Sequence, residues 1–93
     1  MLNKKVKKEL RVTTASFDTE IEDIVAAAIK DLRLAGINVP KNFVRYPKDP
    51  LLVRAVVAYA KAHFGDNEKS EKLLASYESM RTKLYLAGDY RVD

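Results

Sequence analysis

The sequence predicts an all-α protein: a small bundle of about four helices with one long loop between the second and the third. Apolar residues recur at intervals of three and four along most of the chain, which is the period of one helix face. Capping residues precede these segments, and Gly36, Gly65 and Gly88 follow them. No segment shows a convincing strand alternation, and residues 39–46 are the one stretch where a strand could fit.

Length and composition predict one domain over residues 1–93. A chain of 93 residues with 47% hydrophobic and 32% charged residues is typical of a folded protein with one modest core. The absence of cysteine excludes disulfides, cysteine-based zinc sites and a thiol nucleophile. No apolar run approaches the roughly 20 residues that span a bilayer, and none follows the charged N-terminus as in a signal peptide. We therefore expect neither a membrane span nor a signal peptide.

The excess positive charge is confined to the start of the chain. Residues 1–11 contain five of the 17 basic residues and one of the 13 acidic residues, which gives the whole net charge of +4. The remaining chain has 12 basic and 12 acidic residues and is neutral. The chain is therefore a neutral body with a basic N-terminal segment.

A short basic helix is expected within residues 1–12, capped by Asn3. Leu2, Val6 and Leu10 recur every four residues and form a narrow apolar strip. The helix either docks by this strip and leaves its lysines solvated, or turns a basic surface towards phosphate or an acidic partner. The candidate contacts with DNA or an acidic partner are Lys4, Lys5, Lys7, Lys8 and Arg11.

A second helix is predicted over residues 18–36. Thr19 and Glu22 fit a capping box, the first turn is acidic, and Gly36 ends the helix. Its apolar stripe, about 140° wide, should face the core. The stripe consists of Ile21, Ile24, Val25, Ala28, Ile29 and Leu32. Ala26, Ala27 and Leu34 lie on the opposite side and form a small apolar patch where a neighbour could approach.

Residues 37–48 form the long loop. Pro40 and Pro47 exclude a continuous helix, and loops of this length in compact domains are often functional. The loop also contains Phe43, Val44 and Tyr46, which a solvated linker would not need. These side chains either pack on the domain or face a partner.

The third helix, over residues 49–65, is expected to be central and buried. Asp49 caps it, Pro50 occupies its first position, and Gly65 ends it. Arg54 and Lys61 fall within roughly 20° of each other, and almost all of the remaining circumference is apolar. A chain this short has little with which to cover such a helix. Either it is a core helix, or part of it meets a second copy or another protein.

The last helix is predicted over residues 66–88. Leu73, Tyr77, Met80, Leu84 and Ala87 are spaced 4, 3, 4 and 3 residues apart and form one seam. Gly88 ends the helix, and a short tail follows.

The sequence contains no recognisable catalytic or metal-binding constellation, and we expect no cofactor and no enzymatic activity. His63 has no partner at a spacing that would make it a general base, so it is interpreted as structural. A helix-turn-helix DNA reader is a rival interpretation, but residues 67–72 mix charges of both signs where a recognition helix should be basic.

Several motifs resemble one protein family. Residues 10–14 read Leu-Arg-Val-Thr-Thr, residues 17–24 open a long helix with Phe-Asp-Thr-Glu-Ile-Glu-Asp-Ile, and residues 49–55 read Asp-Pro-Leu-Leu-Val-Arg-Ala. Residues 59–65, 76–79 and 86–90 continue the likeness. In order and spacing these motifs are similar to the small head–tail connector proteins, also called head-completion or DNA-packaging proteins, of long-tailed bacteriophages and prophages.

The resemblance implies a structural virion protein at the head–tail junction that assembles in the host cytoplasm. Such subunits form a ring, commonly dodecameric, that extends the DNA channel below the portal. The implied partners are further copies of the chain, the portal protein, a downstream neck or tail-completion protein and genomic DNA bound without sequence preference, with no membrane. The alternative is a small helical DNA-binding or adaptor protein. The candidate subunit or portal interface comprises Ala26, Ala27, Leu34, Phe43, Tyr46, Val53, Arg54, Val57 and Lys61.

Overall fold

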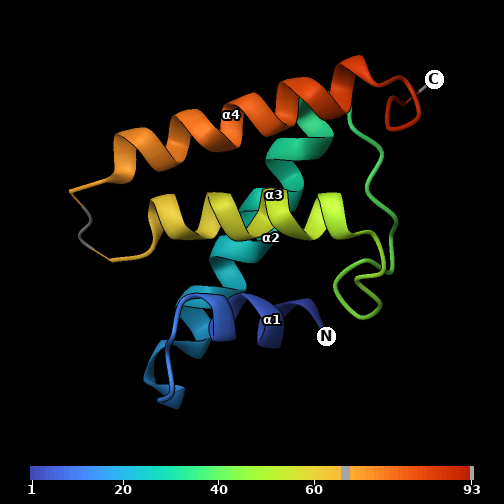
Figure 1. The fold of residues 1–93 in the computed structure, drawn as a ribbon. Coiled ribbons are helices and arrows are strands. Elements are labelled where there is room, and N and C mark those ends of the chain that lie inside the picture. Colours follow the sequence, from blue (N-terminus) through green and yellow to red (C-terminus); the bar gives the residue numbers. More distant parts are fainter. Residues whose placement is uncertain (66–67, 93) are drawn as a thin grey trace.

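The described residues form four α-helices, and the prediction of an all-α protein is confirmed. The computed structural model describes residues 1–65 and 68–92, within which no strand forms. The elements are α1 (Leu2–Glu9), the short 3₁₀ helix η1 (Ala15–Phe17), α2 (Asp18–Leu34), α3 (Pro50–His63) and α4 (Ser70–Leu86). In Figure 1, α3 lies at the centre, with α4 on one side of it, α1 on the other and α2 passing behind it. Helix α3 contacts all three of the other α-helices.

Helix α1 begins at Leu2, so the predicted cap at Asn3 is wrong. Leu2 and Val6 are fully buried, and the N–H of Leu2 donates to the Val44 carbonyl at 2.7 Å. This contact anchors the first residue of the helix on the long loop and leaves Asn3 inside the first turn. The basic segment is therefore a helix that docks by its apolar strip. Whether its lysines contact a partner stays a prediction.

Arg11 ends α1 in a conformation that usually requires glycine. Its φ is +59°, and the N–H groups of Arg11 and Val12 donate to the carbonyls of Lys8 and Lys7. These two bonds are the Schellman pattern, whose left-handed position costs a non-glycine residue about 1–2 kcal/mol.

We expect Arg11→Gly to stabilise the protein by about 0.5 kcal/mol, because the relief of strain exceeds the entropy that glycine adds to the unfolded chain. Urea unfolding measures this change, and Arg11→Ala, which retains the strain, is the control. A glycine variant less stable than the alanine variant would contradict the assignment of strain.

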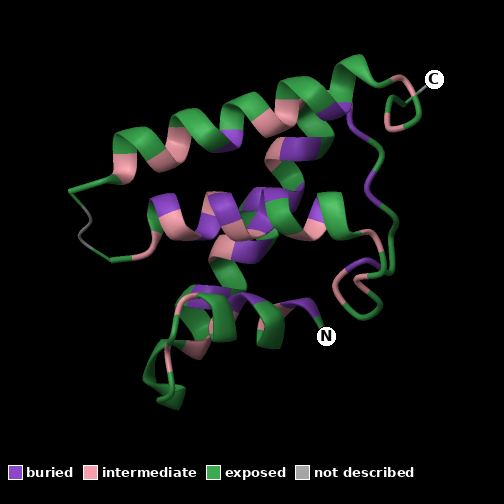
Figure 2. Ribbon diagram, in the orientation of Figure 1, coloured by how far each residue is buried: buried purple, intermediate pink, exposed green. Residues whose placement is uncertain are grey.

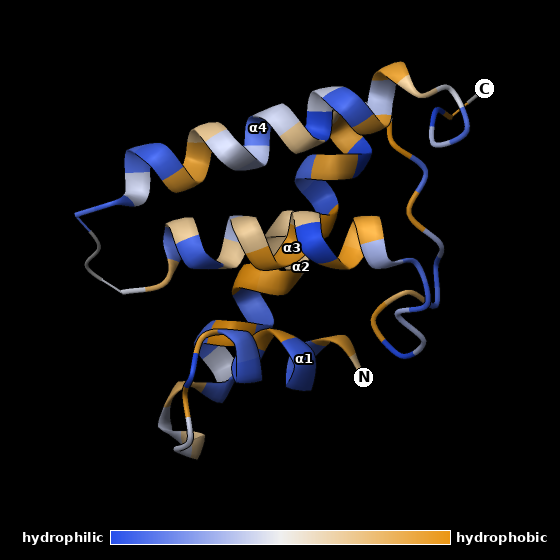
Figure 3. Cartoon of the chain, in the orientation of Figure 1, coloured by the Kyte–Doolittle hydropathy of each residue, from blue (hydrophilic) through white to orange (hydrophobic). Residues whose placement is uncertain are grey.

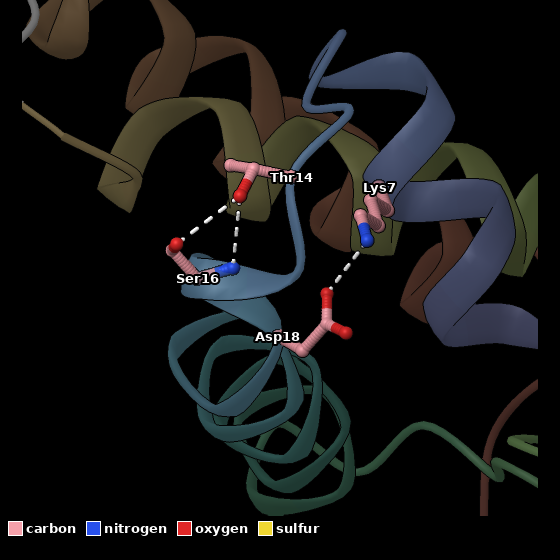
Figure 4. Close-up of polar contacts among 4 residues, drawn as sticks. All are labelled: Lys7, Thr14, Ser16 and Asp18. Atoms are coloured by element: carbon pink, nitrogen blue, oxygen red, sulfur yellow. Dashed lines mark hydrogen bonds and ion pairs between the residues drawn. The ribbon is translucent and has the colours of Figure 1, made fainter.

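Helix α2 does not start with the predicted capping box. It follows η1 without a break, and the N–H of Asp18 already donates to the Ala15 carbonyl. The side-chain cap lies one turn earlier, where Thr14 Oγ1 accepts from the Ser16 N–H at 3.2 Å (Figure 4). Thr19 is consequently an ordinary first-turn residue.

Helix α3 has the predicted start. Pro50 is its first residue, and Asp49 Oδ1 accepts from the N–H groups of Leu51 and Leu52 at 2.9 and 3.3 Å. Figure 3 shows tan and orange along much of this helix, interrupted by blue bands. It is not covered all round, however: Leu52, Ala55 and Val56 are buried, whereas Arg54 is exposed and Val57 half-buried (Figure 2).

Helix α4 begins at Ser70, later than predicted, because residues 68–69 form a turn. The proposed restart at residues 66–67 lies outside the described residues. Along the predicted seam, Tyr77 and Leu84 are buried and Leu73 and Met80 half-buried, but Ala87 is exposed beyond the last helical turn.

The loop and the C-terminal tail close the end of the bundle near the start of α3. Ile37, Val39 and Phe43 are buried, and Arg33 donates to the carbonyls of Val39 and Pro40 at 3.0 and 3.2 Å. The tail lies beside the start of the loop in a single antiparallel bridge between Ile37 and Arg91. The loop therefore contributes three side chains to the core and is not a solvated linker.

Candidate functional site

A groove lies between α1, α3 and α4. Its volume is about 620 Å³. Helix α1 contributes Lys5, Lys8 and Glu9; α3 contributes Val53, Arg54, Val57, Ala58 and Lys61; and α4 contributes Leu73, Ser76 and Met80. The sequence predicted Val53, Arg54, Val57 and Lys61 as one interface and Lys5 and Lys8 as another, and the fold brings both sets together. It did not single out Leu73, Ser76 or Met80 for this groove.

The groove exists because three helices cannot surround α3 completely. At 100° per residue, Arg54, Val57 and Lys61 point away from Leu52 and Tyr59, which face the other helices. Val53 and Val57 touch the core with part of their surface and remain half-exposed. The interpretation as a core helix is therefore confirmed for one side of α3, and the other side is uncovered. That the uncovered side meets another copy or another protein stays a prediction.

The groove combines an apolar floor with a positive rim. Val53, Val57, Leu73 and Met80 supply the apolar surface. Lys5, Lys8, Arg54 and Lys61 oppose the single carboxylate of Glu9, which gives a formal net charge of +3. Such a surface suits a partner that is itself apolar in the middle and acidic at its edges.

The other N-terminal cations point elsewhere. Lys7 pairs with Asp18 at the start of α2, with 2.8 Å between Nζ and Oδ1 (Figure 4). Lys4 lines a separate hollow between α1 and α2, and Arg11 lies beyond the helix end. Lys5 and Lys8 are the two members of the predicted basic set that reach the groove.

The remaining interface candidates are scattered. Ala26 and Leu34 line a hollow of about 560 Å³ that Val44 of the loop also borders, and Ala27 is exposed on the same helix. Tyr46 is 50% exposed on the loop, where Arg45 lies 5.5 Å above its ring. Phe43 is 2% exposed and belongs to the core, so it cannot contact a partner while the fold is intact.

A polar cluster that the sequence did not reveal joins the three long helices. Asp31 of α2 accepts from the Tyr77 hydroxyl at 2.5 Å and from Arg81 at 2.7 Å, both on α4. Tyr77 also packs edge-to-face on Tyr59 of α3, with ring centroids 5.1 Å apart. The spacing of Tyr77 and Arg81 by four residues was the available signal, but nothing in the sequence placed Asp31 opposite them.

The cluster perturbs the acidity of its members. Burial alone would raise the pKa of Asp31, but the hydrogen bonds from Tyr77 and Arg81 outweigh it and lower that pKa. Burial and the Asp31 carboxylate together raise the pKa of Tyr77 well above its ordinary value. His63 stacks on Tyr59 at 4.2 Å, in keeping with the structural role expected of it. The cluster is an interhelical tie, since all of its groups are engaged with one another.

The described residues offer no site for a metal. Among residues 1–65 and 68–92, no group of three or more His, Cys, Asp or Glu side chains could hold an ion.

Comparison with known families gives a match over almost the whole chain. The model of a family described as phage connector protein matches residues 1–91. The chain belongs to the phage connector family. Neither the curated proteins nor the solved structures that were compared gave a match.

Family membership confirms the resemblance found in the motifs. It gives this chain a structural connector role in a phage. No helix among the described residues is long and apolar enough to cross a membrane.

Proposed function

We propose that this connector is the subunit of a homo-oligomeric ring, a dodecamer in the virion, that joins the head portal to the tail or neck. The ring extends the DNA channel, touches genomic DNA without sequence preference, and assembles in the host cytoplasm. Its partners are further copies of the chain, the portal protein and a downstream neck or tail-completion protein.

The observation that carries this proposal is the uncovered side of α3. The groove leaves apolar surface uncovered on Val53, Val57, Leu73 and Met80. A chain this short has few apolar residues with which to form a core, so uncovered apolar surface needs an explanation. Exposed apolar surface rimmed by polar residues is typical of protein–protein contact sites. A connector whose central helix stays open on one side is therefore suited to assembly.

The proposal is tested by the mass of the protein in solution. Light scattering over a concentration series, with electron micrographs of the heaviest fraction, should show rings with a central hole. If the protein alone remains monomeric, light scattering and electron micrographs of its mixture with purified portal show whether a ring forms there. A chain that forms no ring either alone or on portal would overturn the proposal.

Val57→Asp should prevent assembly and leave the monomer folded. A carboxylate on the groove floor would be desolvated in a subunit contact, at a cost of several kcal/mol, whereas in the monomer it stays near water. Light scattering measures whether the variant assembles, and circular dichroism measures whether it is folded. Thr82→Asp, at an exposed position of α4 outside the groove, is the control. Equal loss of folding and of assembly would mean that Val57 acts as a core residue only.

A further inference from the structure

The groove calls for an occupant of defined chemistry. Its floor is apolar, and the side chains of Lys5, Lys8 and Arg54 form no hydrogen bond or ion pair with any other described residue. Duplex DNA would satisfy the cations but would leave Val53, Val57 and Met80 against phosphate and water. A helix that carries small apolar residues and carboxylates satisfies both parts of the groove.

The chain itself carries such a helix surface. Glu20, Glu22 and Asp23 are exposed in the first turns of α2, and no described residue pairs with them. Ala26 and Ala27 follow on the same outer side, three and four residues after Asp23. Alanines permit close approach of another backbone. We call the surface formed by Glu20, Glu22, Asp23, Ala26 and Ala27 the acidic face of α2.

The two surfaces lie on different sides of the subunit. The groove opens between α1 and α4, whereas α2 passes behind α3 with its apolar stripe turned towards it (Figure 1). A contact between two different patches is head-to-tail, so each copy can bind one neighbour through its groove and another through its acidic face. Such contacts form closed rings when the rotation between neighbours closes.

We infer that the groove of one subunit binds the acidic face of α2 of the next copy. Arg54, Lys8 and Lys5 then meet Glu20, Glu22 and Asp23, while Ala26 and Ala27 cover the apolar floor. This inference rests on the proposed ring and adds to it the pair of surfaces that forms each subunit contact.

Two charge-reversed proteins test the pairing. The groove variant carries Lys8→Glu and Arg54→Glu, and the face variant carries Glu20→Lys and Asp23→Lys. Each places like charges at every contact with its own copies, so we expect each to require at least about tenfold more protein to assemble than the wild type. In an equimolar mixture every contact can again join opposite charges, provided that the two variants alternate. We expect the mixture to assemble within about threefold of the wild-type concentration and to form only even-membered rings.

The control carries Lys41→Glu and Lys48→Glu, which make the same change in charge on the loop and outside the groove; it should assemble normally. Circular dichroism checks that each variant is folded. If the face variant is not folded, Glu20→Gln with Asp23→Asn replaces it, and this pair should weaken assembly alone and in mixture with the wild type. All measurements use the condition, alone or on purified portal, in which the wild type assembles.

The outcomes distinguish a failure of the proposed ring from a failure of the proposed pairing of surfaces. If the wild type assembles in neither condition, the ring itself is overturned. Rings of wild type without rescue in the mixture would overturn the pairing and leave the ring intact. A groove variant that assembles normally but loses binding to duplex DNA or to portal would likewise overturn the pairing, because the groove would then hold that partner.

Discussion

Leu2→Ala should destabilise the connector by about 3 kcal/mol, although Leu2 is the second residue of the chain. Its side chain is fully buried, and its N–H donates to the Val44 carbonyl at 2.7 Å. Truncating a buried leucine costs about 2–5 kcal/mol in lost burial and in the cavity left behind. For a domain of this size we expect the melting temperature to fall by about 10–20 °C.

Lys4→Ala, at an exposed position of the same helix, should change stability by less than about 0.5 kcal/mol and is the control. Thermal unfolding of both variants measures the difference. A Leu2→Ala protein as stable as the Lys4→Ala protein would show that α1 is not part of the core. The same burial means that a deletion of residues 1–8 would damage the fold, so the contribution of the lysines to binding has to be measured by substitution.

Tyr77→Phe should cost about 1–2 kcal/mol at neutral pH and should change how stability depends on pH. The substitution keeps the ring against Tyr59 and removes the hydroxyl that donates to Asp31. Hydrogen bonds to charged groups contribute about 1.5–3 kcal/mol, and partial exposure of Asp31 reduces that value here. Arg81 remains bound to the carboxylate, so the cluster is weakened and not abolished.

The advantage of the wild type should be largest at intermediate pH. The pKa of Asp31 is lowered in the folded protein, so its contribution is complete above the unfolded pKa of about 4 and is lost as the pH falls through the folded pKa. The pKa of Tyr77 is raised, so the unfolded chain loses the tyrosine proton first, and stability falls as the pH rises above about 10. The difference in the free energy of unfolding between wild type and Tyr77→Phe should therefore become smaller at low pH and at high pH.

Urea unfolding between pH 2.5 and 11 measures this difference. Tyr85→Phe, at an exposed position of the same helix, is the matched control and should follow the wild type within about 0.5 kcal/mol. A difference between wild type and Tyr77→Phe that stays constant over the whole range would contradict the coupling of Tyr77 to Asp31.

Helix starts were predictable only where a local side-chain signal decided them. Asp49 and Pro50 act on the residues directly after them, and α3 begins as predicted. Thr19 and Glu22 offered an equally good local signal, but the preceding turn at residues 15–17 had already taken the first N–H of α2. At α1, burial of Leu2 overrode the cap at Asn3. Capping signals in the sequence therefore fail to predict a helix start where a neighbouring element already hydrogen-bonds or buries the same backbone groups.

The residues of the candidate site likewise divide into those whose positions could be predicted from the sequence and those whose positions could not. Arg54 and Lys61 could be placed on one strip of α3 from their spacing alone, since seven residues are nearly two turns. Phe43 could not be placed, because an apolar loop residue has the same sequence signal whether it faces the core or a partner. The ion pair of Lys7 with Asp18 likewise depends on the packing of α1 on α2 and not on any spacing within either helix.

By itself the sequence determined the four helices, the apolar stripes that join them, the basic start of the chain and the phage connector family. These follow from periodicity, caps and motif order, which act within single segments. Only the tertiary structure decided that Lys5 and Lys8 share a groove with Arg54, Val57 and Met80, and that Asp31 ties α2 to α4. Such contacts depend on which sides of distant helices meet, and that choice is made by the packing of the whole core around α3.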